Sequence, residues 1–172
     1  MKAIVRTCWQ ICLLRQGPQM FPQSWILFAI LLLVYMALDV VEFVAQGLRG
    51  WVLLPELLLD TGLLLAFFAL VLLIWQKLER FNQTLSALLG SGSIIMLAAV
   101  PVSLAATLLP AHSDMVTAAG LLLYGILAWN VLVMGHILRY ALHTWFTLGI
   151  IIAGTYTLLN LVMFDVLFPI KA

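Results

Sequence analysis

The sequence predicts an all-α membrane protein with five transmembrane helices and an N-terminal amphipathic helix at the membrane interface. Hydrophobic residues make up 65% of the 172 residues and charged residues only 9%, and the mean hydropathy is +1.18. Soluble domains are about half apolar, so lipid is the expected solvent of this chain. The apolar residues also gather in runs that reach the ~20 residues needed to cross a hydrocarbon core. We therefore treat residues 1–172 as a single membrane domain.

Residues 1–23 are expected to form a short cytoplasmic helix followed by a break. In residues 3–15, AIVRTCWQICLLR, the helical period separates a cationic stripe from an apolar one. With Trp9 as an interface residue, such a basic helix tends to lie on the membrane surface. Gly17 and Pro18 then end the helix.

The two cysteines, Cys8 and Cys12, lie four residues apart on one face of this helix. Two thiols without a neighbouring histidine are too few for a zinc site, so we expect reduced thiols. Fatty acylation stays open as an alternative. His112 and Asp114, in a short loop, give only a weak metal signal. We therefore expect no metal and no other cofactor.

Five spanning segments follow and are expected to form a helical bundle over residues 24–168. The third segment is interrupted by Gly90, Gly92 and Pro101 and is rich in small residues. Small residues permit close approach of helix backbones, so we expect this helix to be central in the bundle. The expected segments are 24–44, 52–75, 85–109, 115–137 and 145–168.

The basic residues predict the orientation of these spans. Lys and Arg favour the cytoplasmic side of a membrane. With the N-terminus inside, six basic residues lie in cytoplasmic segments and two lie outside; the six are Lys2, Arg6, Arg15, Lys77, Arg80 and Arg139, and the two are Arg49 and Lys171. We therefore expect a multi-pass protein of the cell inner membrane with a cytoplasmic N-terminus and a periplasmic C-terminus.

The acidic residues lie mainly on the outer side of the predicted bundle. Asp39 and Glu42 lie near the outer end of the first span, and Glu56 and Asp60 begin the second. Each pair is three or four residues apart and so shares one face of its helix. If these two faces meet, four carboxylates converge beneath Arg49, which lies in the connecting loop.

Two interpretations of these four acids remain open. The cluster could bind a cation or hold a proton, because like charges in a poor solvent favour proton uptake. Alternatively the acids are structural or contact a partner. Glu56 follows Pro55 in a first helical turn, where an acid complements the helix macrodipole, and Glu42 is shallow enough to be hydrated. Asp39 and Asp60 lie deeper, where an ionised acid costs about 2.5–3.5 kcal/mol at the bilayer centre, unless a wet vestibule or hydrogen bonds to neighbouring helices satisfy them.

A second group of candidate residues lies on the cytoplasmic side. His136 and Arg139 sit near the inner end of the fourth span, at the level of Lys77 and Arg80. Snorkelling of these side chains to the interface is the favoured interpretation. Contact with a lipid head group or a partner protein is the alternative.

Polar and small residues inside the spans predict contacts between helices. Asn130 and Asn160 are mid-membrane and are expected to form hydrogen bonds across helices. Gly149 and Ala153, four residues apart on the fifth span, predict a close helix–helix approach.

The sequence argues against several function classes. A net charge of +1 provides no basic field for nucleic acid. The chain has no HExxH, no GxSxG and no Walker loop. We identify no catalytic residues and expect a protein that is not an enzyme.

Two segments resemble the later half of bacterial Yip1-type membrane proteins. They are RFNQTLSALLGSGSIIMLAAVPVSLAA and LLLYGILAWNVLVMGHILRYALHTWFTLGIIIAGTY, within roughly residues 80–165. The shared features are a polar entry into a small-residue helix, the mid-helix Pro101, and a helix that carries Trp129 and ends at the basic Arg139. The resemblance implies five spans with the N-terminus inside. It does not cover the acidic hairpin, and the small-GTPase binding of eukaryotic members is not carried over to this chain.

The predicted function is a non-enzymatic inner-membrane scaffold or accessory subunit that binds membrane lipid, another membrane protein or a second copy of itself. Short loops and packing-type residues favour this interpretation. The alternative is a small oligomeric channel or transporter, coupled to ions or protons, that uses the outer acids. A membrane-embedded enzyme acting on lipid is a third option, for which the sequence shows no acid–base pair.

Overall fold

The computed structural model describes residues 2–47, 50–110 and 113–168. These residues form helices joined by turns and contain no β-strand. Five helices are long and apolar enough to cross a membrane, which confirms the prediction of an all-α fold and of five helices with the length and composition of membrane spans. The six α-helices are α1 (Lys2–Cys12), α2 (Trp25–Ala45), α3 (Leu53–Ile74), α4 (Phe81–Leu108), α5 (Asp114–Leu142) and α6 (Phe146–Leu167). Short 3-10 turns occupy Pro18–Met20, Gly50–Val52 and Leu78–Arg80.

Two helices are longer than predicted. The polar run that starts at Asn82 belongs to α4 and not to the loop before it, because Asn82 and Thr84 are buried in the bundle. The last turns of α5 extend past the predicted end, and the helix stops at His143, which adopts a left-handed conformation with φ 53°. At about 1.5 Å per residue, both helices exceed the roughly 30 Å hydrocarbon core.

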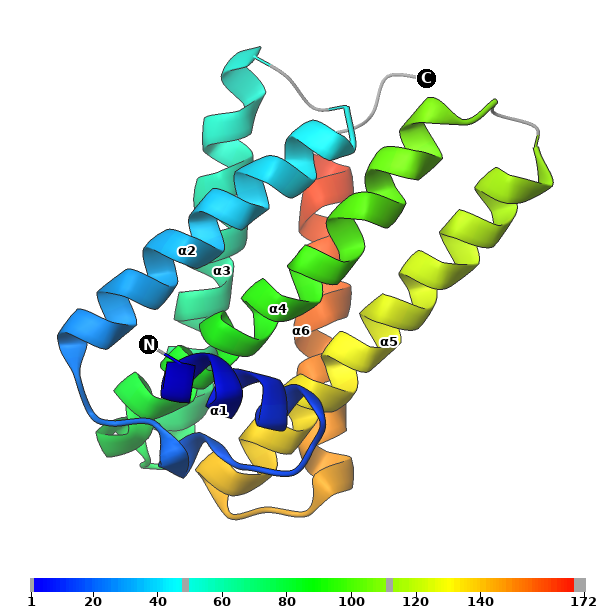
Figure 1. The fold of residues 1–172 in the computed structure, drawn as a ribbon. Helices are drawn as coiled ribbons and strands as arrows, with labels where there is room; N and C mark the ends of the chain where they lie inside the picture. The colour runs from blue at the N-terminus through cyan, green and yellow to red at the C-terminus, as the bar shows by residue number, and fades with distance from the viewer. Residues whose placement is uncertain (1, 48–49, 111–112, 169–172) are drawn as a thin grey trace.

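The bundle has chemically different ends (Figure 1). We call the end where α2 ends and α3 begins the acidic end, and the opposite end, where α3 ends and α4 begins, the basic end. Within the described residues, the basic positions lie in α1 and the turn after it, between α3 and α4, and in the last turn of α5. Arg49 and Lys171 are outside the residues that the structure describes.

Helix α4 is the central helix, as predicted. It packs against α1, α2, α3 and α5. Its glycines lie at close contacts: a Cβ on Gly90 would come within 2.7 Å of the Cys8 sulfur, and one on Gly92 within 3.0 Å of the Tyr35 ring. Gly90, Gly92 and Pro101 do not break the helix, because α4 is helical from Phe81 to Leu108.

Helices α5 and α6 meet through glycine. A Cβ on Gly149 would collide with the carbonyl oxygen of Gly135, and one on Gly135 would lie 2.9 Å from the backbone nitrogen of Ile150. Ala153, one turn further along α6, is completely buried. The small residues therefore bring the two backbones together, which confirms the close approach predicted for the last span.

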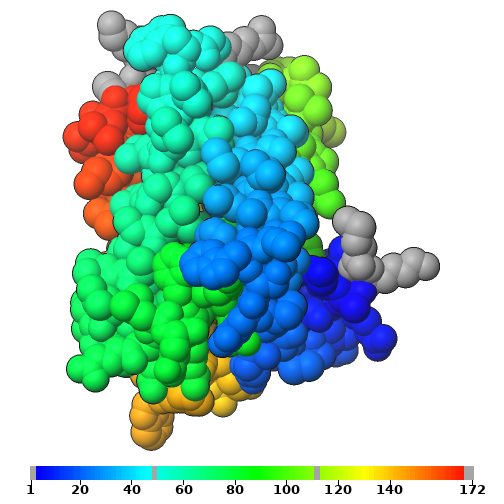
Figure 2. Space-filling model, turned by 90° about the vertical axis from the view of Figure 1, so that its left-hand side faces the viewer, coloured from blue at the N-terminus to red at the C-terminus, as the bar shows by residue number. Residues whose placement is uncertain are grey.

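The packing of α5 and α6 is tight only near the basic end. Every buried residue of α5 lies between Val133 and Leu142, and α6 buries only Gly149, Ala153 and Tyr156. Figure 2 shows another face of the molecule, on which α2 and α3 lie side by side above the turn before α4 and the start of α4. The half of the bundle nearer the acidic end is therefore the more open half.

Helix α1 crosses α4 in the half nearer the basic end (Figure 1). It buries Cys8, Ile11 and Cys12 and leaves Trp9 half exposed. At its end, the indole nitrogen Nε1 of Trp129 donates to the carbonyl oxygen of Cys12 at 2.9 Å. One face of α1 is thus part of the protein core.

We expect the two thiols to be unreactive in the folded protein. Burial raises the pKa of Cys8 to about 11 and that of Cys12 to about 12, so both stay protonated at neutral pH, and the thiolate is the reactive form. Alkylation by N-ethylmaleimide at pH 7.5, followed by mass spectrometry, should be at least roughly tenfold slower in the folded protein than in the denatured one.

The control for this experiment is Val5→Cys, whose site lies on the same helix and is 63% exposed. The new thiol should react rapidly under the same conditions. Equally rapid labelling of Cys8 or Cys12 would show that α1 does not dock on α4.

Candidate functional site

The four predicted acids come together at the acidic end. We call Asp39, Glu42, Glu56 and Asp60 the acid quartet. The side chains of Asp39, Glu42 and Glu56 are 3%, 9% and 2% exposed, and Asp60 is half-buried. Glu42, which its shallow position predicts to be hydrated, has little exposed surface and lines a cavity described below. Glu56 does lie in the first turn of α3, as predicted.

Asp60 is the best-satisfied member of the acid quartet. The hydroxyl of Tyr35, on α2, donates to Asp60 Oδ2 at 2.9 Å. The side-chain amide of Asn160, on α6, donates to Asp60 Oδ1 at 2.8 Å. These hydrogen bonds join three helices, which confirms that the acidic faces of α2 and α3 meet and that Asn160 bonds across helices.

Asp39 has the opposite environment. Its carboxyl group is within electrostatic range of the carboxyl groups of Asp60, Glu42 and Glu56. Its Oδ2 is buried without a hydrogen-bond partner, as are Oε2 of Glu56 and the hydroxyl of Thr61. Buried polar groups normally have partners, and buried charges are normally paired. The acid quartet therefore has acceptor oxygens to spare for a proton or a cation.

Glu42 makes a separate set of contacts, toward α4. The Ser103 hydroxyl donates to Glu42 Oε1 at 2.5 Å, and the Gln46 amide donates to the same oxygen at 3.0 Å. Glu42 Oε2 has no partner. The carboxylate is thus fixed in position by one oxygen while its other oxygen stays unsatisfied.

A cavity of about 660 Å³ opens beside Glu42 and Ser103. We call it the bundle cavity. Most of its lining is apolar and comes from α4 and α5, with a few residues of α2, α3 and α6. No sequence pattern predicts this cavity. It exists because the half of α5 nearer the acidic end does not close onto α4. Its polar lining residues are Tyr35, Glu42, Gln46, Ser103, Thr107, Tyr124 and Asn130.

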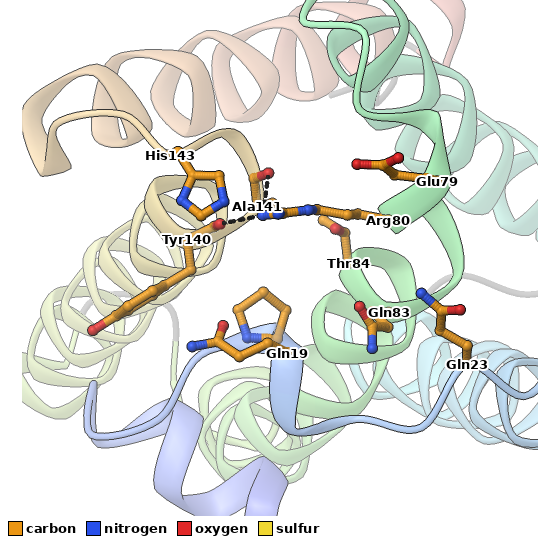
Figure 3. A pocket seen from close by; sticks show the side chains of 10 residues that line it. Gln19, Gln23, Glu79, Arg80, Gln83, Thr84, Tyr140, Ala141 and His143 are labelled. Carbon is orange, nitrogen blue, oxygen red and sulfur yellow. Dashed lines mark hydrogen bonds between the residues drawn. The ribbon is translucent and has the colours of Figure 1, made fainter.

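The second predicted group gathers around Tyr140, at the basic end. The Arg80 guanidinium donates to the carbonyl oxygens of Tyr140 and Ala141 at 3.2 and 3.3 Å (Figure 3). Arg80 thereby caps the C-terminal end of α5, where a cation complements the macrodipole. Arg139 is exposed, with its guanidinium carbon 5.4 Å from the centre of the Tyr140 ring.

His136 does not snorkel, contrary to the prediction. It is 5% exposed, and its Nε2 lies 3.1 Å from the carbonyl oxygen of Gln16. Its ring also packs edge-on against Tyr140, with 5.0 Å between ring centroids. Lys77 is half-buried in the turn before α4. The second predicted group therefore forms no single site. His136 and Arg139 contact Tyr140, and Lys77 and Arg80 lie in the turn before α4.

A polar pocket of about 460 Å³ lies beside Arg80 (Figure 3). Its lining includes side chains from the turn after α1, from the start of α4 and from the end of α5; they are Gln19, Gln23, Glu79, Gln83, Thr84 and His143. The cationic Arg80 in this pocket is already engaged by two carbonyl groups, and Glu79 opposes an anion there.

The remaining predicted residues have simpler positions. Asn130 lines the bundle cavity, and no cross-helix hydrogen bond of its side chain is seen among the described residues. Asp114 is exposed at the start of α5. His112, the other residue of the weak metal signal, lies outside the described residues. Across residues 2–47, 50–110 and 113–168, no group of three His, Cys, Asp or Glu side chains could hold a metal ion.

Two residues of the site were missed from the sequence. Tyr35 precedes Asp39 by four residues, so helical spacing alone could have placed it on the acidic face. Ser103 is one of the small residues of α4, a type that predicts helix packing, and its contact with Glu42 depends on how α4 is rotated against α2.

Comparison with known proteins does not assign a role to these sites. No protein-family model, no curated protein and no solved structure matches this chain. The resemblance to Yip1-type membrane proteins therefore stays a prediction from the sequence.

Proposed function

We propose that this protein is a non-enzymatic membrane subunit that binds a membrane lipid in the bundle cavity. The proposal rests on the cavity, which has a volume of about 660 Å³ and a mostly apolar lining. Ligand pockets usually measure about 300–1,000 Å³ and combine apolar walls with a few placed polar groups. Bound lipid would also cover the apolar lining that α4 and α5 leave uncovered.

The first experiment is purification in a mild detergent from native membranes, followed by mass spectrometry of co-purified lipids and proteins. The test variant is Ala99→Phe, because Ala99 lines the cavity and a phenyl ring there would fill part of it. The matched control is Ala98→Phe, whose site is exposed on the same helix. A lipid that is retained by the control and lost from Ala99→Phe supports the proposal. Equal lipid content in both variants contradicts it.

The proposed orientation has a cytoplasmic N-terminus, a periplasmic C-terminus and α1 at the cytoplasmic interface of the inner membrane. The excess of basic residues at one end of the bundle supports it. An alkaline phosphatase fused after Ala172 should therefore be active, because that enzyme needs the oxidising periplasm. A fluorescent cytoplasmic reporter at the same position should be silent. The reverse pattern would overturn the orientation.

A second candidate function is proton- or cation-coupled transport by an oligomer. It is favoured by one observation, the unpartnered buried oxygens of Asp39 and Glu56. In proteoliposomes, the double variant Asp39→Asn with Asp60→Asn should lose ion or proton flux while still inserting into the membrane. Flux that is unchanged in the double variant would exclude the acid quartet as its path.

A further inference from the structure

Four of the polar residues that line the bundle cavity are grouped near one end. Glu42 and Gln46 lie in the last turns of α2, and Ser103 and Thr107 lie in the last turns of α4. The deeper lining is mostly apolar and includes Leu64, Leu88, Ile95 and Met134, and its polar members are Tyr35, whose hydroxyl bonds Asp60, and Asn130. A cavity with one polar pole and a long, mostly apolar remainder fits an amphiphile better than a wholly apolar or wholly polar molecule.

The polar pole carries negative charge. Glu42 lines it, and an ionised carboxylate only accepts hydrogen bonds. The basic positions that the structure describes all lie toward the basic end (Figure 1). An anionic head group would be repelled at this pole, whereas a cationic one would be attracted.

The available hydrogen-bonding groups are mainly acceptors. Ser103 uses its hydroxyl proton to bond Glu42 Oε1, so its own oxygen has lone pairs left to accept with. Glu42 Oε2 has no donor. A primary ammonium group has three N–H donors and could satisfy both oxygens at once. A quaternary ammonium carries the same charge but has no N–H to donate.

We infer that the bundle cavity takes a membrane lipid with a primary ammonium head group, held by Glu42 and Ser103, with its hydrocarbon part between α4 and α5. This inference rests on the proposed lipid-binding function and names the chemical class of the lipid. It assigns Glu42, not the Asp39–Asp60 pair, as the residue that selects the ligand.

The test measures binding of four single-chain probes to the purified protein in neutral maltoside micelles at pH 7.5, by isothermal titration calorimetry. The probes share one chain length: dodecylamine, dodecyltrimethylammonium, dodecanol and dodecyl sulfate. Dodecylamine should bind roughly tenfold tighter than dodecanol, the factor that corresponds to about one charge-assisted hydrogen bond. Dodecyltrimethylammonium should fall between the two, and dodecyl sulfate should bind most weakly.

The variants assign this preference to residues. Glu42→Gln should remove the advantage of dodecylamine over dodecanol and leave dodecanol binding unchanged. Glu79→Gln, an exposed acid at the basic end, should keep the wild-type preference. If Glu42→Gln does not fold, Ser103→Ala provides the second test and should weaken dodecylamine binding severalfold without affecting dodecanol.

The outcomes separate this inference from the function on which it rests. Equal binding of dodecylamine and dodecanol by the wild-type protein would overturn the ammonium inference and leave lipid binding intact. Tight binding of dodecyl sulfate would overturn it as well. No binding of any probe, together with equal lipid content in Ala98→Phe and Ala99→Phe, would overturn both the inference and the proposed function.

Discussion

The Gly149→Val variant is expected to lose about 2–3 kcal/mol of unfolding free energy, in the range for overpacked sites. A Cβ at this position collides with the carbonyl oxygen of Gly135, and a backbone carbonyl in a helix has no free rotamer into which it can move. Helices α5 and α6 must separate, and they lose the contacts around the fully buried Ala153. Unfolding in mixed micelles, followed by circular dichroism, measures the loss.

The matched control is Gly154→Val on the same helix, where an added Cβ meets nothing within 4 Å. Both variants have the same intrinsic helix preference, so that contribution cancels between them. Equal stabilities of the two variants would show that the contact between Gly135 and Gly149 does not hold α5 against α6.

Opposite effects are expected at the two deeper acids of the acid quartet. Asp60→Ala removes the acceptor of both Tyr35 and Asn160. Each donor that stays buried without a partner costs about 1–3 kcal/mol, so this variant should lose roughly 2–4 kcal/mol of unfolding free energy. Asp39→Asn removes only an acid that has an unpartnered oxygen, so it should be neutral or stabilising.

The same unfolding measurement distinguishes the two acids. Asn160→Leu serves as a further control, because it should weaken the fold less than Asp60→Ala does: it leaves the Tyr35 bond in place. If Asp39→Asn lowers the free energy of unfolding and Asp60→Ala does not, the roles assigned here to the two acids are the wrong way round.

The features that depend on local patterns were predicted well. Apolar runs of spanning length located five helices, and the helical spacing of Asp39 to Glu42 and of Glu56 to Asp60 placed each acid pair on one face. The predicted third span begins at residue 85, whereas α4 begins at Phe81 and includes the polar Asn82 and Thr84. They are helical because other parts of the protein bury them.

The features that depend on the packing of distant segments were not predictable. The bond from Trp129 to Cys12 joins residues 117 positions apart, so no local pattern marks α1 as part of the core. His136 resembles an interfacial residue in its sequence position, yet it is buried because the turn after α1 provides the carbonyl of Gln16. The bundle cavity depends on how far α5 leans from α4, which hydropathy does not encode.

The uneven closure of α5 along its length has a mechanical consequence. Near the basic end α5 packs closely on its neighbours, whereas the bundle cavity, of about 660 Å³, follows α5 from Gly120 to Met134 and has the liquid volume of roughly twenty water molecules. Entry or exit of an occupant therefore changes the area that the protein takes up more in the leaflet at the acidic end than in the other. Work against the lateral pressure of the leaflet at the acidic end then enters the free energy of binding. Lipids that alter the pressure profile would shift occupancy without contacting a single residue of the cavity.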